Sequence, residues 1–123
     1  MSIHFQEDKR IFTLQTKHTT YQFMADPYGF LIHLYYGEKT EGDMDYLLTY
    51  RDRGFSGNPY DAGMDRTYSL DALPQEYPFM GSGDFRSSAL VVRTEDQTYG
   101  CDLRYRDYKI SDGKYGLEGL PAV

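Results

Sequence analysis

The stretch DRTYSLDALPQEYPFMGSGDFR, residues 65–86, decides how the rest of the chain is interpreted. It holds two prolines and two glycines, but also four aromatic side chains. A disordered linker would be poor in aromatics because it has no core in which to bury them. A central strand would exclude both prolines because neither has the N–H that a ladder needs. We therefore predict an ordered, extended surface segment, the kind of segment on which binding residues tend to lie.

The aromatics of this stretch would pin it to the core, and its charged residues would be exposed at fixed places. The predicted pins are Tyr68, Tyr77, Phe79 and Phe85. The predicted exposed charges are Asp65, Arg66, Asp84 and Arg86.

Outward from this stretch, the chain has the pattern of an all-β scaffold. Alternating apolar and polar residues between Gly, Pro and Asp turns predict strands at 3–6, 10–16, 19–25, 30–36, 87–94 and 98–110. Residues 30–36 are apolar on both faces, which is typical of a strand covered on both sides in a sandwich. Residues 51 to 86 would form a long, ordered, irregular region. No stretch of helical periodicity interrupts the pattern, so we predict one domain, 1–123, with an all-β, β-sandwich fold.

Two segments are less regular. Residues 46–50 fit either a short strand or a helical turn, and the sequence does not decide between them. In 98–110, apolar side chains alternate with period 2 until Tyr108 and Ile110 fall out of phase, which predicts a bulge near Asp107. Cys101 lies on the apolar face of this segment with no histidine nearby, so we expect a small core residue.

Composition argues against several classes of protein. A net charge of −6 is unsuited to a nucleic-acid binder, whose phosphate contacts require basic clusters. No run of 18 apolar residues is present, so we expect no membrane span. The first residues lack the apolar region of a signal peptide, and one cysteine cannot form an internal disulfide; both favour the cytoplasm. The thirteen tyrosines suit half-buried strand faces, and they also suit sugar-binding surfaces.

The residues give little support to metal or catalytic chemistry. The three histidines lie on separate predicted strands without ligand spacing, and the acidic loop 41–45 lacks the glycine and final glutamate of a calcium loop. The GSG motif at 81–83 has no helix after it to bind phosphate. Two carboxylates can hydrolyse a glycosidic bond, but a sequence fixes no distance between them. The loop carboxylates that qualify are Asp52, Asp65, Asp71, Glu76 and Asp84.

A polar set on irregular backbone remains as a candidate sugar site. Aspartate accepts hydrogen bonds from sugar hydroxyls, and the arginine fork donates them. The alternative is that these charges pair with one another on the surface, where a pair contributes at most about 1 kcal/mol; the residues alone slightly favour this alternative. The set consists of Asp52, Arg53, Asp65, Arg66, Asp84 and Arg86.

Six motifs, in order along the chain, resemble the N-terminal β-domain of glycoside hydrolase family 36 α-galactosidases. They are YGFLIHLYYG (28–37), RTYSLD (66–71), LPQEYP (73–78), GDFR (83–86), DLRY (102–105) and GLEGLPA (116–122). The resemblance implies an N-terminal β-supersandwich, similar to the galactose-mutarotase fold, that precedes a (β/α)8 barrel in much longer proteins. That barrel would supply an aspartate nucleophile and an aspartate acid/base, which hydrolyse terminal α-linked galactose with retention. Its motifs do not occur here, so we expect no catalytic residue in this chain.

The resemblance also implies site residues. In tetrameric bacterial members, a loop of this domain reaches the active site of a neighbouring subunit, where an aspartate binds the galactosyl group. In the matching stretch YRDRGF (50–55) that residue is Asp52, and Arg66, which opens the RTYSLD motif, is the second choice. The implied partners are an α-galactoside of the melibiose or raffinose type and the other subunits of a homotetramer, with no cofactor, metal, nucleic acid or membrane. The alternative is a stand-alone carbohydrate-binding or structural β-module without a hydrolase partner.

Overall fold

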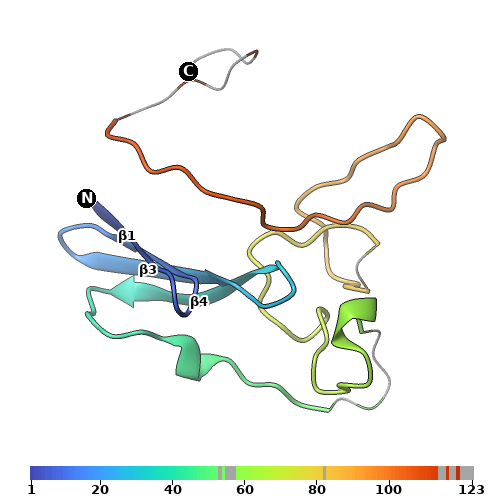
Figure 1. The fold of residues 1–123 in the computed structure, drawn as a ribbon, viewed down its shortest axis with the longest axis horizontal. Helices are drawn as coiled ribbons and strands as arrows, with labels where there is room; N and C mark the ends of the chain where they lie inside the picture. Colours follow the sequence, from blue (N-terminus) through green and yellow to red (C-terminus); the bar gives the residue numbers. More distant parts are fainter. Residues whose placement is uncertain (53, 55–57, 82, 114–115, 117–118, 120–123) are drawn as a thin grey trace.

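The computed structural model of the chain describes residues 1–52, 54, 58–81, 83–113, 116 and 119 (Figure 1). Four strands form an antiparallel meander in the order β1-β2-β3-β4. They are β1 (Ser2–Gln6), β2 (Ile11–Gln15), β3 (Thr19–Ala25) and β4 (Leu31–Glu38). Two short 3-10 turns follow, η1 (Asp45–Leu47) and η2 (Tyr60–Ala62), and the described residues contain no α-helix. The all-β prediction is confirmed. The described residues contain one four-stranded antiparallel sheet.

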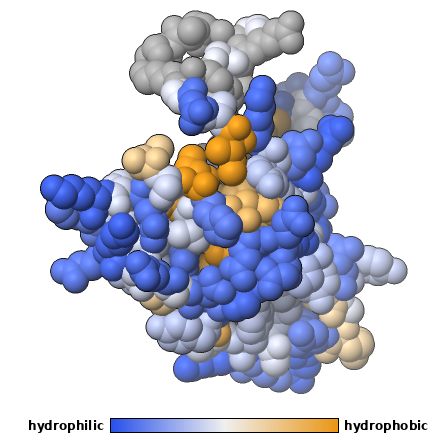
Figure 2. Space-filling view, turned by 60° about the vertical axis from the view of Figure 1, so that its left-hand side comes forward, coloured by the Kyte–Doolittle hydropathy of each residue, from blue (hydrophilic) through white to orange (hydrophobic). Residues whose placement is uncertain are grey.

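One face of the sheet is aromatic. The register places Phe12 opposite both Phe5 and Phe23, and the ring centroids are 4.5 and 4.8 Å apart. Tyr108, far along the chain, packs its ring 4.4 Å from that of Phe5. The segment that carries Tyr108 therefore runs over this face, as Figure 1 shows for the orange-red chain above the sheet. Figure 2 shows a mainly hydrophilic surface with a compact apolar patch beside the residues drawn grey.

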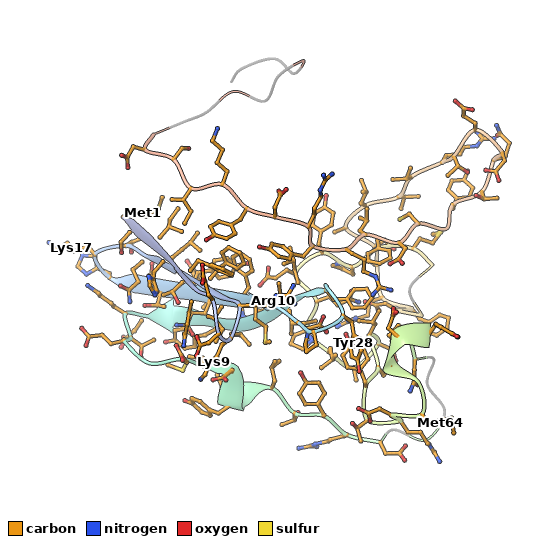
Figure 3. All side chains as sticks on the ribbon, viewed as in Figure 1. Met1, Lys9, Arg10, Lys17, Tyr28 and Met64 are labelled. Atoms are coloured by element: carbon orange, nitrogen blue, oxygen red, sulfur yellow. The ribbon has the colours of Figure 1, made fainter. Side chains whose placement is uncertain are left out.

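The opposite face is polar and holds the segment that follows β4. The Gln22 amide donates to the Gly42 carbonyl at 3.0 Å, and its Oε1 accepts from the Met44 N–H at 3.0 Å. In the turn between β1 and β2, Lys9 Nζ lies 3.0 Å from Asp43 and 3.1 Å from Asp45 (Figure 3). The acidic loop is thus tied to the sheet by hydrogen bonds to Gln22 and ion pairs with Lys9.

The hydrophobic core lies where β4 meets the irregular segment after η2. The backbone of that segment bonds the edge of β4, since the His33 N–H donates to the Pro74 carbonyl at 2.7 Å and the Glu76 N–H donates to the Leu31 carbonyl at 2.9 Å. The buried cluster consists of Phe30, Ile32, Ala62, Tyr68, Leu70, Leu73 and Phe79. The prediction of an ordered irregular region is confirmed for its described residues. Of the four predicted pins, Tyr68 and Phe79 are buried, whereas Tyr77 and Phe85 are exposed.

The strands predicted at 87–94 and 98–110 are wrong. These residues are extended but belong to no sheet; an isolated parallel bridge joins Leu90 to Phe79. Isolated hydrogen bonds attach the later part to other segments, from the Cys101 N–H to the Met80 carbonyl at 3.2 Å and from the Tyr105 N–H to the Gly29 carbonyl at 2.6 Å. Alternation of apolar and polar residues indicates an extended chain with two different faces. A strand in a sheet also needs a neighbouring strand with which its backbone can form hydrogen bonds. Among the described segments none forms a ladder with these residues.

Four smaller predictions can also be compared with the structure. The bulge expected near Asp107 has no sheet to interrupt, and the observed irregularity lies between Gln22 and Phe23, where β3 pairs with β4. The prediction that residues 30–36 are covered on both sides holds only in part. Ile32 and Leu34 are buried, but the residues that alternate with them are half-buried, and Tyr36 is 70% exposed. The undecided segment 46–50 begins within the 3-10 turn η1. Cys101 is half-buried and packs against the core cluster, as expected.

Candidate functional site

The structure brings Asp52 and Arg66 together. Arg66 Nη2 lies 3.3 Å from Asp52 Oδ1 and also donates to the Gly54 carbonyl at 3.2 Å. The same Asp52 oxygen accepts the Gly54 N–H at 2.8 Å, which closes an Asx turn. Both side chains stay largely in water, Asp52 at 48% and Arg66 at 63% exposed. The pair thus holds a carboxylate and a guanidinium side by side on an accessible loop.

This arrangement can recognise a polyol. The described contacts of Asp52 use Oδ1, so Oδ2 can accept sugar hydroxyls, while the remaining N–H groups of Arg66 can donate. An exposed ion pair of this kind contributes little to stability. The predicted alternative, in which the charges pair with one another on the surface, therefore describes the contact of Asp52 with Arg66. Their role toward a substrate stays a prediction.

Asp65 organises the same loop through its side chain. Its Oδ1 accepts the Thr67 N–H at 2.9 Å and the Thr67 hydroxyl at 2.6 Å, and these bonds hold the pKa of Asp65 below its ordinary value. The Asn58 side chain donates to the Asp65 carbonyl, which links the two arms of the loop. Arg53, the other predicted loop residue, lies outside the described residues.

Asp84 and Arg86 form a structural clamp, so the prediction that Asp84 is exposed is wrong. The Asp84 side chain is 1% exposed and bonds Arg86 through both of its oxygens, at 2.8 Å each. The Gln75 amide donates to Asp84 Oδ2 at 2.7 Å. Arg86 Nη2 also donates to the carbonyls of Leu70 and Leu73, at 2.7 Å each. Burial alone would raise the pKa of Asp84, but the bonds and charge of Arg86 outweigh it and the pKa is lowered.

Sequence reasoning missed a second buried carboxylate, Asp26. Its Oδ1 accepts the N–H groups of Tyr28 and Phe30 at 2.9 and 2.8 Å, and the Tyr68 hydroxyl donates to its Oδ2. Burial, and then this bond, raise the pKa of Tyr68. Asp26 opens the sequence DPYG (26–29), which has the composition of a turn, and an aspartate that opens a turn commonly bonds the backbone two residues on. The bonds of Asp26 to its own turn could therefore have been predicted from the sequence. Its contact with Tyr68, 42 residues later, could not.

His33 lies on strand β4, as the sequence predicted, and contacts a carboxylate. Its Nδ1 lies 2.6 Å from Glu76 Oε1, across the junction between β4 and the irregular segment. Glu76 also accepts from the Tyr21 hydroxyl; burial first, and then this bond, raise the pKa of Tyr21. Glu76 therefore links β3, β4 and the segment beside them.

The candidate hydrolytic carboxylates do not form an acid/base pair. Asp52, Asp84 and Glu76 are each paired with a different basic side chain. A general acid requires a raised pKa, whereas those of Asp65 and Asp84 are lowered. The described part of the chain also contains no group of three or more His, Cys, Asp or Glu able to hold a metal ion, and no helix there is long and apolar enough to cross a membrane.

The chain matches the family model described as the glycosyl hydrolase family 36 N-terminal domain over residues 29–123. It is 63% identical, over its full length, to the bifunctional alpha-galactosidase/sucrose kinase AgaSK of Mediterraneibacter gnavus, and 41% identical over 97% of its length to the alpha-galactosidase Mel36A of Lactobacillus acidophilus. It spans 13% and 16% of these two relatives.

Solved structures agree with these matches. The galactosidase domain of AgaSK superposes with a TM-score of 0.92 at 62% identity, and the match covers 99% of this chain and 17% of that one. A variant of the alpha-galactosidase AgaA from Geobacillus stearothermophilus, in complex with raffinose, gives a TM-score of 0.79 at 39% identity; that match covers 91% of this chain and 16% of the other.

Proposed function

This chain belongs to the glycosyl hydrolase family 36 N-terminal domain family, and from that premise we propose that it serves a longer α-galactosidase as a non-catalytic domain. In this proposal residues 1–123 form one N-terminal β-domain, and the catalytic aspartates lie elsewhere in the polypeptide. The substrates are terminal α-galactosides such as melibiose or raffinose. The whole enzyme is a cytoplasmic homotetramer, and the single cysteine is compatible with that compartment.

The specific proposal is that Asp52 and Arg66 complete the galactose pocket of a neighbouring subunit. The observation that carries it is the exposed pair itself, with Arg66 Nη2 3.3 Å from Asp52 Oδ1 on a loop closed by Gly54. A carboxylate beside a guanidinium matches the alternating hydroxyl donors and acceptors of a sugar ring. Both groups are accessible without rearrangement of the core.

The test is the change Asp52→Ala in the full-length enzyme. It removes one or two charge-assisted hydrogen bonds to substrate, so we expect kcat/KM for an aryl α-galactoside to fall about ten- to a hundredfold. The free energy of unfolding should hardly change, because an exposed pair contributes little. The matched control is Asp8→Ala, which removes an exposed carboxylate from the turn between β1 and β2. Equal kinetics for Asp52→Ala, Asp8→Ala and the wild type would overturn the proposal.

A mixing experiment tests whether Asp52 acts between subunits. Subunits with Asp52→Ala keep the catalytic aspartates, and subunits that lack the barrel nucleophile keep the loop. If Asp52 acts across the interface, hybrid tetramers should recover part of the activity that each parent has lost. Strictly additive activities of the two parents, with hybrids shown to form, would place Asp52 in the pocket of its own subunit.

A further inference from the structure

A pocket of about 520 Å³ opens between the η2 turn, a wall made by Phe79, Gly81 and Gly83, and the segment 101–105. We call residues 101–105 the strap. Its volume lies within the range of about 300–1,000 Å³ that is typical of small-ligand sites. Core residues form its apolar lining, namely Phe30, Leu70 and Phe79. Its polar lining includes Asn58, Asp61, Asp102 and Arg104. Neither Asp52 nor Arg66 is among the described residues that line it.

Arg104 fixes the polar groups of this pocket. Its guanidinium lies 4.1 Å from the ring centre of Phe30 and donates to the Tyr28 carbonyl at 2.7 Å. From there it binds Asp61 Oδ2 at 3.0 Å and Asp102 Oδ1 at 2.5 Å. These ion pairs engage one oxygen of each carboxylate. The second oxygen of each carboxylate belongs to a side chain that is at least half exposed. Arg104 therefore fixes both carboxylates and leaves these oxygens able to accept hydrogen bonds from a ligand.

Tyr60 supplies an aromatic surface to the same pocket. It is the first residue of η2 and lines the opening with 98% of its surface exposed to water. A tyrosine that contributes nothing to the core is available for a ligand, and its flat apolar ring with a polar tip suits the C–H face of a sugar.

The charges of the pocket select among ligand classes. Two carboxylates against one guanidinium leave a net negative charge, which disfavours phosphates and other anions. The guanidinium between the carboxylates repels a metal cation from the place where both oxygens would have to coordinate it. A neutral ligand rich in hydroxyl groups satisfies the free carboxylate oxygens, the Asn58 amide and the Tyr60 ring together. We propose that this pocket binds a neutral saccharide, at a site separate from the Asp52–Arg66 pair.

Raffinose, a neutral oligosaccharide, is the probe for this proposal. Titrated into the isotope-labelled chain, it should shift the backbone amide signals of Asp61, Gly81 and the strap in a saturable way. Changing Tyr60→Ala or Asp102→Asn should each weaken binding about three- to tenfold, the effect of losing one ring contact or one hydrogen bond. Asp61→Asn is a second variant in case Asp102→Asn disturbs the strap. Inorganic phosphate should cause no saturable shift.

Two controls separate this site from the proposed galactose-binding loop. Asp52→Ala should leave raffinose binding unchanged here, and so should Tyr46→Ala, which removes another exposed tyrosine, in η1. Absence of saturable shifts would overturn the proposal. So would binding that survives the changes at Tyr60, Asp61 and Asp102 but is lost in Asp52→Ala. Because Asp52 is judged by the kinetics of the whole enzyme, either proposal can fail without the other.

Discussion

Asp84 shows how one buried charge can hold several segments in place. The change Asp84→Ala removes the acceptor of the Gln75 amide and of Arg86, whose own bonds to Leu70 and Leu73 depend on its position. Arg86 is 42% exposed and can be partly hydrated, so we expect the free energy of unfolding to fall by about 3 kcal/mol, the low end for a broken buried pair. Urea unfolding measures this change, with Asp8→Ala as the unaffected control. A loss below about 0.5 kcal/mol, the range of neutral surface changes, would contradict the clamp.

The same residue predicts a dependence of stability on pH. The pKa of Asp84 is lowered in the folded chain, because Arg86 outweighs the effect of burial. A lowered pKa stabilises the fold above the ordinary pKa of aspartate, about 3.9, and this contribution is lost as the pH falls below it. Between pH 5 and pH 3, about the range in which aspartate titrates, the wild type should therefore lose more stability than Asp84→Asn. Parallel curves for the two proteins would show that Asp84 is not linked to acid unfolding.

At the scale of elements, the Asp26 turn joins the sheet to the irregular segment. Its carboxylate binds the turn backbone on one side and the Tyr68 hydroxyl on the other. The change Tyr68→Phe leaves Asp26 Oδ2 buried without this donor, so we expect a loss of about 1–3 kcal/mol. Urea unfolding at pH 7 measures it. Tyr46→Phe, which removes an exposed hydroxyl, is the control and should be neutral.

The contact between Tyr68 and Asp26 should also make the free energy of unfolding depend on pH in the alkaline range. The pKa of Tyr68 is raised, first by burial and then by its bond to Asp26, above the value of about 10 that tyrosine has in an unfolded chain. Its stabilising contribution is therefore present below pH 10 or so and is lost as the pH rises, because the unfolded chain ionises first. Tyr68→Phe should lose less stability than the wild type between pH 9 and pH 11. A wild-type curve no steeper than that of the variant would refute the linkage.

Over the whole molecule, sequence reasoning succeeded where contacts are local. The meander follows from alternation and turn residues, so its four strands were predicted to within two residues at every end. It failed where structure depends on distant partners: residues 98–110 alternate like a strand but pair with none of the described segments. The choice of Asp52 and Arg66 came from a family resemblance, and their contact with each other was not predicted as such, because no periodicity links positions on irregular backbone. The burial of Asp84 was hidden for the same reason.

Amides in the sheet ladders and amides held by a single isolated hydrogen bond should differ in their rates of hydrogen exchange. The amides of β2 and β3 belong to ladders with partners on both sides of each strand, whereas the Tyr105 amide depends on one bond to the Gly29 carbonyl. Small openings suffice to expose an isolated bond, and only a larger opening exposes a central ladder. We expect the Tyr105 amide to exchange well before the amides of β2 and β3. Equal protection would show that the strap opens only when the whole chain unfolds.

The position of Arg104 over Phe30 has a consequence for the order in which the chain assembles during synthesis. Every strand of the sheet has been made by residue 38, and each pairs with its neighbour in sequence, so little loop entropy opposes the meander. The carbonyl that Arg104 binds lies 76 positions earlier. Until the ribosome has released those residues, the ring of Phe30 lacks its cover on that side. During this interval a nascent chain presents an apolar surface to chaperones and to its own copies, and the arrival of one arginine closes it.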